Sequence, residues 1–160
     1  MRQHCSTTAP FLLNSKPGEK DPITAQGRMD PAQLTGLVFE NCTVDGTKEY
    51  MKDFSSNPSV HKAYLGRPWK MYSRTVFLNS YLGKLIRPEG WMPWNGSFAL
   101  DTLFYGEYQN YGPGAKVPGR VPWSNQISKL NVGLYSVQSF IQGDKWLRSS
   151  DSKLAKQGHF

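Results

Sequence analysis

The sequence predicts an all-β chain that folds as a parallel β-helix, in which each coil adds a short strand to a stacked sheet. Short β-rich runs are separated by long, variable stretches with little helical periodicity before residue 128. The step Val38-Phe39-Glu40-Asn41 recurs as Val76-Phe77-Leu78-Asn79. A β-sandwich would show a strand about every 8 to 12 residues, whereas a solenoid tolerates loops of variable length between its strands.

The expected elements follow one another along the chain. Turn-forming residues fill the stretch 14–33, and the first β-rich run, TGLVFENCTV, comes directly after it. A helical turn is expected at 48–54. The second run is SRTVFLNSYLG, and a loop that holds GWMPWNGS separates it from the third run, TLFYGEYQNYGPG. The segment YSVQSFIQGDKWL is either a short helix or a final strand that packs Phe140, Ile141 and Trp146.

Equivalent positions of successive coils lie above one another in a solenoid. We therefore expect Phe39 and Phe77 to stack as an internal ladder, and Asn41 and Asn79 to do the same. The step Leu103-Phe104-Tyr105-Gly106 keeps the aliphatic and aromatic residues without the asparagine, which makes Phe104 the expected third member of the ladder.

The composition of the 160 residues fits one domain and an acidic partner. Lys and Arg number 19 against 12 Asp and Glu, which gives a formal net charge of +7. The basic residues are spread from Arg2 to Lys156 rather than gathered in a nucleic-acid-binding arm. No apolar run approaches the roughly 18 residues of a membrane span. The opening apolar patch is too short for a signal-peptide core, so we expect a secreted form to carry a leader absent from this sequence.

The common signatures of catalytic and cofactor sites are missing from the sequence. It contains no G-x-S-x-G elbow, no P-loop and no H-E-x-x-H, and no cofactor is expected. Cys5 and Cys42 allow at most one internal disulfide and cannot form a structural zinc site unaided. Sequons make Asn41 and Asn95 candidate glycosylation acceptors.

Cationic and aromatic residues are the remaining candidates for a binding site. Arg67 stands between a glycine and a proline in YLGRPWK, and its planar guanidinium favours bidentate pairing with a carboxylate. Trp69, Trp91 and Trp94 offer faces on which sugar rings can stack, with core packing as the alternative for each. This combination suits a ligand that is both ring-built and anionic.

Five segments in series carry a resemblance to a known family: ITAQGRMDP, YLGRPWK, SRTVFLNS, GWMPWNGSFALDTLFYGEYQNYGPGA and FIQGDKWL. Over residues 17–147 the chain resembles plant pectin methylesterases, or pectinesterases. The resemblance implies a right-handed, single-stranded parallel β-helix. It divides the chain into a poorly matching segment 1–16, a partial catalytic domain 17–147 and a frayed tail 148–160.

The resemblance also implies an activity and roles for particular residues. The family hydrolyses methyl esters of cell-wall pectin (homogalacturonan) with release of methanol, outside the cell. Arg67 would be catalytic, by holding the nucleophilic aspartate in an ion pair. The substrate-binding residues implied are Trp69, Trp91 and Trp94. Cys5 and Cys42 would form a disulfide. Pectin and a proteinaceous pectinesterase inhibitor are the implied partners.

The sequence departs from the family pattern in its acidic residues. The family's nucleophilic and acid–base aspartates belong to motifs upstream of TAQGR, and neither a QDTLY-like nor a DFIFG-like segment occurs here. We therefore expect the chain to correspond to the C-terminal half of the catalytic domain. An active esterase, a chain that binds pectin without cleaving it, and an incomplete product without a role of its own are three open hypotheses. A nucleic-acid binder is a fourth.

Overall fold

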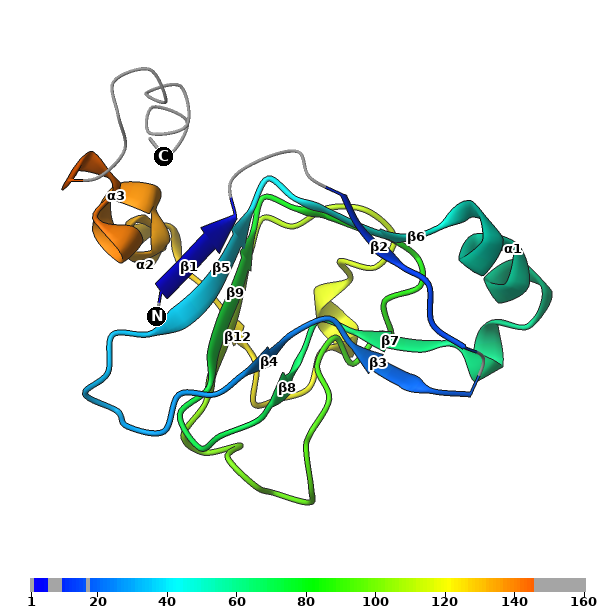
Figure 1. The fold of residues 1–160 in the computed structure, drawn as a ribbon, viewed down its shortest axis with the longest axis horizontal. Helices are drawn as coiled ribbons and strands as arrows, with labels where there is room; N and C mark the ends of the chain where they lie inside the picture. The colour runs from blue at the N-terminus through cyan, green and yellow to red at the C-terminus, as the bar shows by residue number, and fades with distance from the viewer. Residues whose placement is uncertain (1, 6–9, 17, 146–160) are drawn as a thin grey trace.

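The computed structural model describes residues 2–5, 10–16 and 18–145, and for 2–5 only the course of the backbone. Its strands pair in parallel and stack coil upon coil (Figure 1). The largest sheet has five strands in the order β1-β5-β9-β11-β12. Their bounds are Arg2–Cys5 for β1, Gly36–Glu40 for β5, Arg74–Leu78 for β9, Phe104–Tyr108 for β11 and Asn125–Gln126 for β12.

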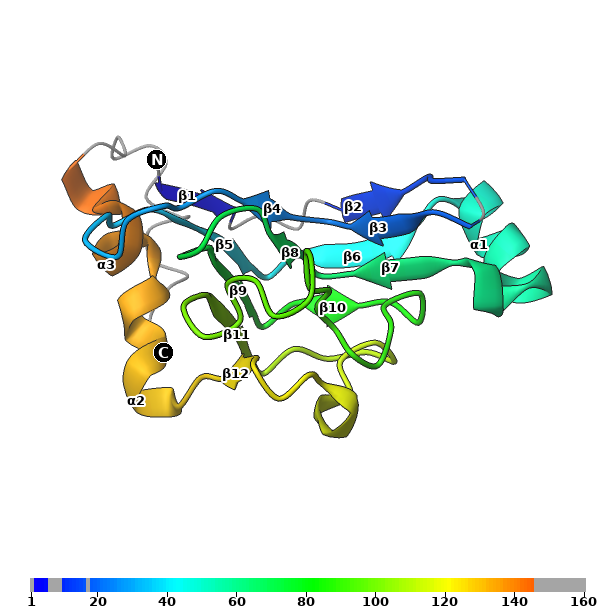
Figure 2. The ribbon, with the colours of Figure 1, turned by 90° about the horizontal axis from the view of Figure 1, so that it is seen from below.

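Two further sides complete each coil. The second sheet has the order β10-β6-β2, with β2 at Pro10–Leu13, β6 at Thr43–Gly46 and β10 at Tyr81–Leu82. The third side holds two pairs: β3 (Lys20–Pro22) with β7 (Lys62–Tyr64), and β4 (Ala25–Gln26) with β8 (Arg67–Pro68). Isolated parallel bridges extend these pairs to the next coil. The predicted parallel β-helix is confirmed, and Figure 2 shows its coils from the side.

Strands β3 and β4 lie inside the stretch 14–33, where the sequence indicated only turns. Both are three residues long or shorter, and each pairs with a strand about one coil further along the chain. Their local sequence is rich in proline and glycine, so it carries no β signal of its own. Pairing with a distant segment, rather than local propensity, makes them strands.

The predicted phenylalanine ladder is right for its first two members and wrong for the third. Phe39 and Phe77 are partners in the β5–β9 register, and their rings stack with centroids 4.6 Å apart. Glu107, not Phe104, stands beside Phe77 on the next strand. Side chains alternate between the two faces of a strand. Phe104 therefore points away from the interior, and its ring stacks on Tyr135.

Asn41 and Asn79 hold equivalent positions at a corner of the coils, but the predicted internal stacking of the two asparagines is wrong, because Asn41 is exposed and Asn79 is only half-buried. Both residues follow directly after paired strands and have positive φ angles of 54° and 47°. Gln109 takes this place in the next coil, with φ of 47°. Asparagine tolerates the left-handed region better than most residues, which suits it to a tight corner.

One helix lies in the connection between β6 and β7, and the C-terminal helices follow β12, with the last of them packed beside β1 of the large sheet. Helix α1 (Lys48–Ser56) confirms the turn expected at 48–54, and Thr47 caps it by accepting a hydrogen bond from the Tyr50 N–H. The C-terminal segment forms helices α2 (Lys129–Val132) and α3 (Val137–Ile141), not a strand. Short 3₁₀ helices occupy Pro58–Val60, Val117–Gly119, Gly133–Tyr135 and Gly143–Lys145. Trp146 and the tail 148–160 lie outside the described residues.

Both faces of the five-stranded sheet are buried. Inside the coils, Phe77, Trp91 and Tyr105 belong to the main apolar cluster. On the outer face, Val76 and Phe140 belong to a second cluster, where α3 packs beside β1. None of the helices in the described part of the chain is long and apolar enough to cross a membrane.

Phe77→Ala is expected to lower the free energy of unfolding by about 3–5 kcal/mol, because it leaves a cavity where a fully buried ring stacks on Phe39. Urea unfolding measures the change. Phe98→Ala removes the same atoms from a ring that is 39% exposed and should cost less than about 1 kcal/mol. Equal losses for the two variants would contradict the predicted interior stacking.

Candidate functional site

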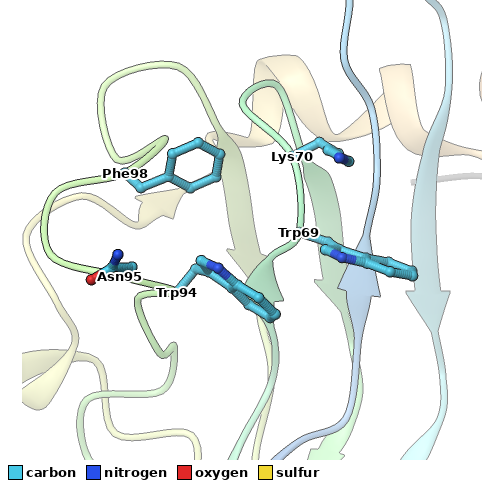
Figure 3. A pocket seen from close by; sticks show the side chains of 5 residues that line it. All are labelled: Trp69, Lys70, Trp94, Asn95 and Phe98. Carbon is cyan, nitrogen blue, oxygen red and sulfur yellow. The ribbon is translucent and has the colours of Figure 1, made fainter.

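A groove of about 340 Å³ lies between two exposed tryptophans (Figure 3). Its lining residues are Trp69, Lys70, Trp94, Asn95 and Phe98. Trp69 is 57% exposed and Trp94 45% exposed. The lining comes from two segments, one directly after β8 and the other in the loop before β11. Large aromatic side chains that stay exposed beside a concave surface are typical of a ligand site.

Arg67 is fixed on β8 and reaches Trp94. Its backbone N–H donates to the Thr24 carbonyl at 3.0 Å, and the residue pairs with Ala25 of β4. The guanidinium carbon lies 4.2 Å from the centroid of the Trp94 ring, which is a cation–π contact. The Arg67 Nε is buried and has no hydrogen-bond acceptor among the described residues. Because a buried donor without an acceptor is costly, this N–H is available to an acceptor that enters the site.

Close packing of two neighbouring segments positions Arg67 relative to Trp94. Gly66 and Trp91 form a parallel bridge, and the Met92 N–H donates to the Gly66 carbonyl at 3.0 Å. A Cβ atom on Gly66 would overlap the Thr24 side chain and press on the Trp91 ring. Glycine is therefore required where the two coils approach each other.

Trp91 belongs to the core and not to the groove. It is fully buried, and its ring stacks on Tyr105 with centroids 4.4 Å apart. Its indole N–H donates to Glu107 Oε1 at 3.1 Å. The prediction that Trp91 contacts substrate is therefore corrected, because neither ring face is open to a ligand. Burial also raises the pKa of the Tyr105 hydroxyl.

Glu107, which accepts the hydrogen bond from Trp91, forms a buried ion pair with Arg120 that was not predicted from the sequence. Glu107 accepts hydrogen bonds from Arg120 Nε at 2.8 Å and from Arg120 Nη2 at 3.0 Å, and each side chain is only 3% exposed. Arg120 also donates to the carbonyls of Pro88 and Gly114. In the sequence, Glu107 stands beside an aromatic run, and no charged residue at a regular spacing from it indicates a partner. Its inward place on the strand, two residues after Tyr105, was the available signal.

The segment TAQGR plays a structural part. The buried side-chain oxygen of Gln26 accepts hydrogen bonds from the backbone N–H groups of Arg28 and Arg74 at 3.0 and 2.9 Å. The Arg28 guanidinium, 6% exposed, donates to backbone carbonyls, among them that of Asp30. These contacts fix the loop between β4 and β5. Within the described ranges, no three His, Cys, Asp or Glu side chains gather as a metal site.

Comparison with known proteins decides the family. The model of the family described as Pectinesterase matches residues 2–144. The chain belongs to the pectinesterase family. Probable pectinesterase/pectinesterase inhibitor 64 of Arabidopsis thaliana is 59% identical over 129 residues, which cover 81% of this chain and 21% of that protein. Pectinesterase/pectinesterase inhibitor PPE8B of Prunus persica is 47% identical over 155 residues, which cover 94% of this chain and 28% of that protein.

Solved pectinesterase structures share the fold. Pectin methylesterase from carrot superposes with a TM-score of 0.77 at 44% identity, over 91% of this chain and 44% of that chain. Pectin methylesterase from Aspergillus niger gives a TM-score of 0.62 at 25% identity, over 81% of this chain and 39% of that chain. The chain thus spans less than half of the carrot enzyme and about a quarter of the curated relatives.

The remaining predictions for this pectinesterase-family chain stay predictions. The Cys42 side chain is buried, whereas that of Cys5 lies outside the described ones, so their disulfide is untested. Asn41 and Asn95 are both exposed, as a glycosylation acceptor must be. Asn95 also lines the groove. The structure brings Arg67, Trp69 and Trp94 together, and their roles belong to the proposal below.

Arg120→Met is expected to lower the free energy of unfolding by about 3–5 kcal/mol, because it leaves the Glu107 carboxylate buried without its counter-charge. Thermal and urea unfolding measure the loss. Arg87→Met is the matched control, because it breaks a pair with Glu89 whose side chains are 38% and 46% exposed. That pair should contribute about 0–1 kcal/mol. A loss at Arg120 as small as that at Arg87 would contradict a structural role for the buried pair.

Proposed function

We propose that this chain provides the pectin-binding groove of a pectin methylesterase, an enzyme that hydrolyses methyl esters of homogalacturonan and releases methanol. The observation that carries the proposal is the groove between Trp69 and Trp94, with the Arg67 guanidinium stacked on Trp94. Membership of the pectinesterase family and the likeness to the carrot enzyme support it.

The groove has the chemistry that an acidic sugar polymer requires. The two exposed indole rings give flat apolar faces for the sugar rings, and binding to them removes apolar surface from water. The cations Arg67 and Lys70 complement carboxylates, and the net charge of +7 attracts a polyanion over a longer range.

Ester hydrolysis by this family would need an aspartate beside Arg67. The resemblance assigns Arg67 the task of holding that aspartate, and its buried Nε has a free donor position for a carboxylate. A carboxylate held in this way stays ionised, as a nucleophile must be, because the nearby positive charge favours the charged form. The aspartate oxygen then bonds to the ester carbonyl carbon, the bond to methoxide breaks, and methoxide takes a proton from the family's second, acid–base aspartate and leaves as methanol. Water, which gives a proton back to that second aspartate, cleaves the acyl–aspartate and releases the free galacturonate carboxylate and the nucleophile.

The lining of the groove favours a second candidate function, which is binding of pectin without cleavage. None of the residues that line the groove carries a carboxylate, so the lining supplies ring faces and a cation but no nucleophile. For either candidate we propose a secreted protein of the cell wall, with pectin as its polymer partner. A pectinesterase inhibitor protein is a further proposed partner, suggested by the paired names of the relatives.

Arg67→Ala is expected to weaken retention of the purified chain on highly methylated pectin, because it removes the cation that holds the Trp94 ring. Co-sedimentation with pectin measures retention, and methanol assayed in the same sample measures turnover. Arg87→Ala, which removes a partly exposed arginine that is paired with Glu89 and lines no part of the groove, is the matched control.

The two readouts separate the candidates. Retention with methanol release that Arg67→Ala abolishes supports the esterase. Retention without methanol supports the binding function. A folded chain that neither stays on pectin nor releases methanol would contradict both.

A further inference from the structure

The groove contains a positive charge without a negative one. Its lining consists of three aromatic residues, one asparagine and Lys70. The ion pairs that join described residues are Arg87 with Glu89 and Arg120 with Glu107, so Lys70 is in neither. A lysine that lines an otherwise uncharged hollow is a ready partner for an anionic ligand group.

Lys70 extends from a fixed base. Its backbone N–H donates to the Ser73 hydroxyl at 3.3 Å, and its carbonyl accepts from that hydroxyl at 2.7 Å. Ser73 itself is fully buried. The Lys70 Cγ lies 3.8 Å from where a Cβ on Gly27 would stand, so the lysine stem runs close beside the Gly27 backbone. In Figure 3, Lys70 and Trp69 extend to the same side of their segment.

The two cations near the groove hold different positions. Arg67 is half-buried, and its guanidinium is stacked on the Trp94 ring. Lys70 is exposed and lines the groove directly. Arg67 is therefore suited to a group held within the site, whereas Lys70 is suited to a charged group of a ligand that occupies the groove.

We infer that Lys70 makes this groove selective for a galacturonate ring whose carboxylate is already free, over a ring that is still methyl-esterified. A free carboxylate forms a charge-assisted hydrogen bond with an ammonium group, and such bonds are about twice as strong as neutral ones. A methyl ester is neutral and offers only its carbonyl. The inference rests on the proposed function and deepens it, since it names which ring of a partly esterified polymer lies against Lys70.

The test compares two oligogalacturonides of equal length, one unesterified and one fully methyl-esterified, by isothermal titration calorimetry with the 160-residue chain. Lys70→Gln removes the charge and keeps most of the side chain's length. It should weaken binding of the unesterified ligand about two- to fivefold, the range for an exposed ion pair. Binding of the esterified ligand should not change. The difference should shrink in about 0.5 M salt, because exposed charges are then screened.

Lys52→Gln is the matched control, because Lys52 is an exposed lysine on α1 and lines no part of the groove. It makes the same change in net charge and should alter neither affinity. Equal weakening of both ligands by Lys70→Gln, or unchanged binding of the unesterified one, would overturn the inference and leave the proposed function standing. A wild-type chain that binds neither ligand would overturn the proposed function and this inference with it.

Discussion

The rest of the structure depends on the register in which the coils stack. Each coil must place its inward side chains above those of the coil before it, as Phe77 lies on Phe39 with ring centroids 4.6 Å apart. In the next coil this inward position holds Glu107, a carboxylate in an apolar interior. Burial of that charge is tolerable because Arg120 pairs with it in bidentate fashion and the indole of Trp91 donates to it.

The groove takes its geometry from this interior. Trp91 and Trp94 are three residues apart in the sequence, but Trp91 packs in the core and Trp94 lines the groove. Trp91 is held inside by its bridge to Gly66 and its hydrogen bond to Glu107. Trp94 lies in the loop that follows, where it is exposed and meets the guanidinium of Arg67. The buried ion pair of Glu107 and Arg120 thus helps to hold Trp91, and through it the loop in which Trp94 meets Arg67, although the pair lines no part of the groove.

The fold class could be predicted from the sequence because a solenoid repeats its inward positions, as Phe39 and Phe77 show, and because its strands are short and separated by long, variable loops. Phe104 was misassigned because an aliphatic–aromatic step does not reveal which face of a strand is inward. Strands β3 and β4, within residues 20–26, were predicted only as turns, because they form by pairing with the distant strands β7 and β8. The groove residues Arg67, Trp69 and Trp94 were found from residue chemistry and family motifs. Burial separated Trp91 from them, and burial is set by tertiary packing that the local sequence does not contain.

The proposed function requires pectin to contact the exposed Trp69 and Trp94 and not the buried Trp91. Indole N–H signals of the chain labelled with ¹⁵N-tryptophan, followed by NMR while a partly methyl-esterified oligogalacturonide is added, test it most directly. The signals of Trp69 and Trp94 should move in proportion to binding, while that of Trp91 should stay in place, because its N–H is bonded to Glu107 inside the core. Movement of the Trp91 signal with no change at Trp69 and Trp94 would contradict pectin binding at the groove.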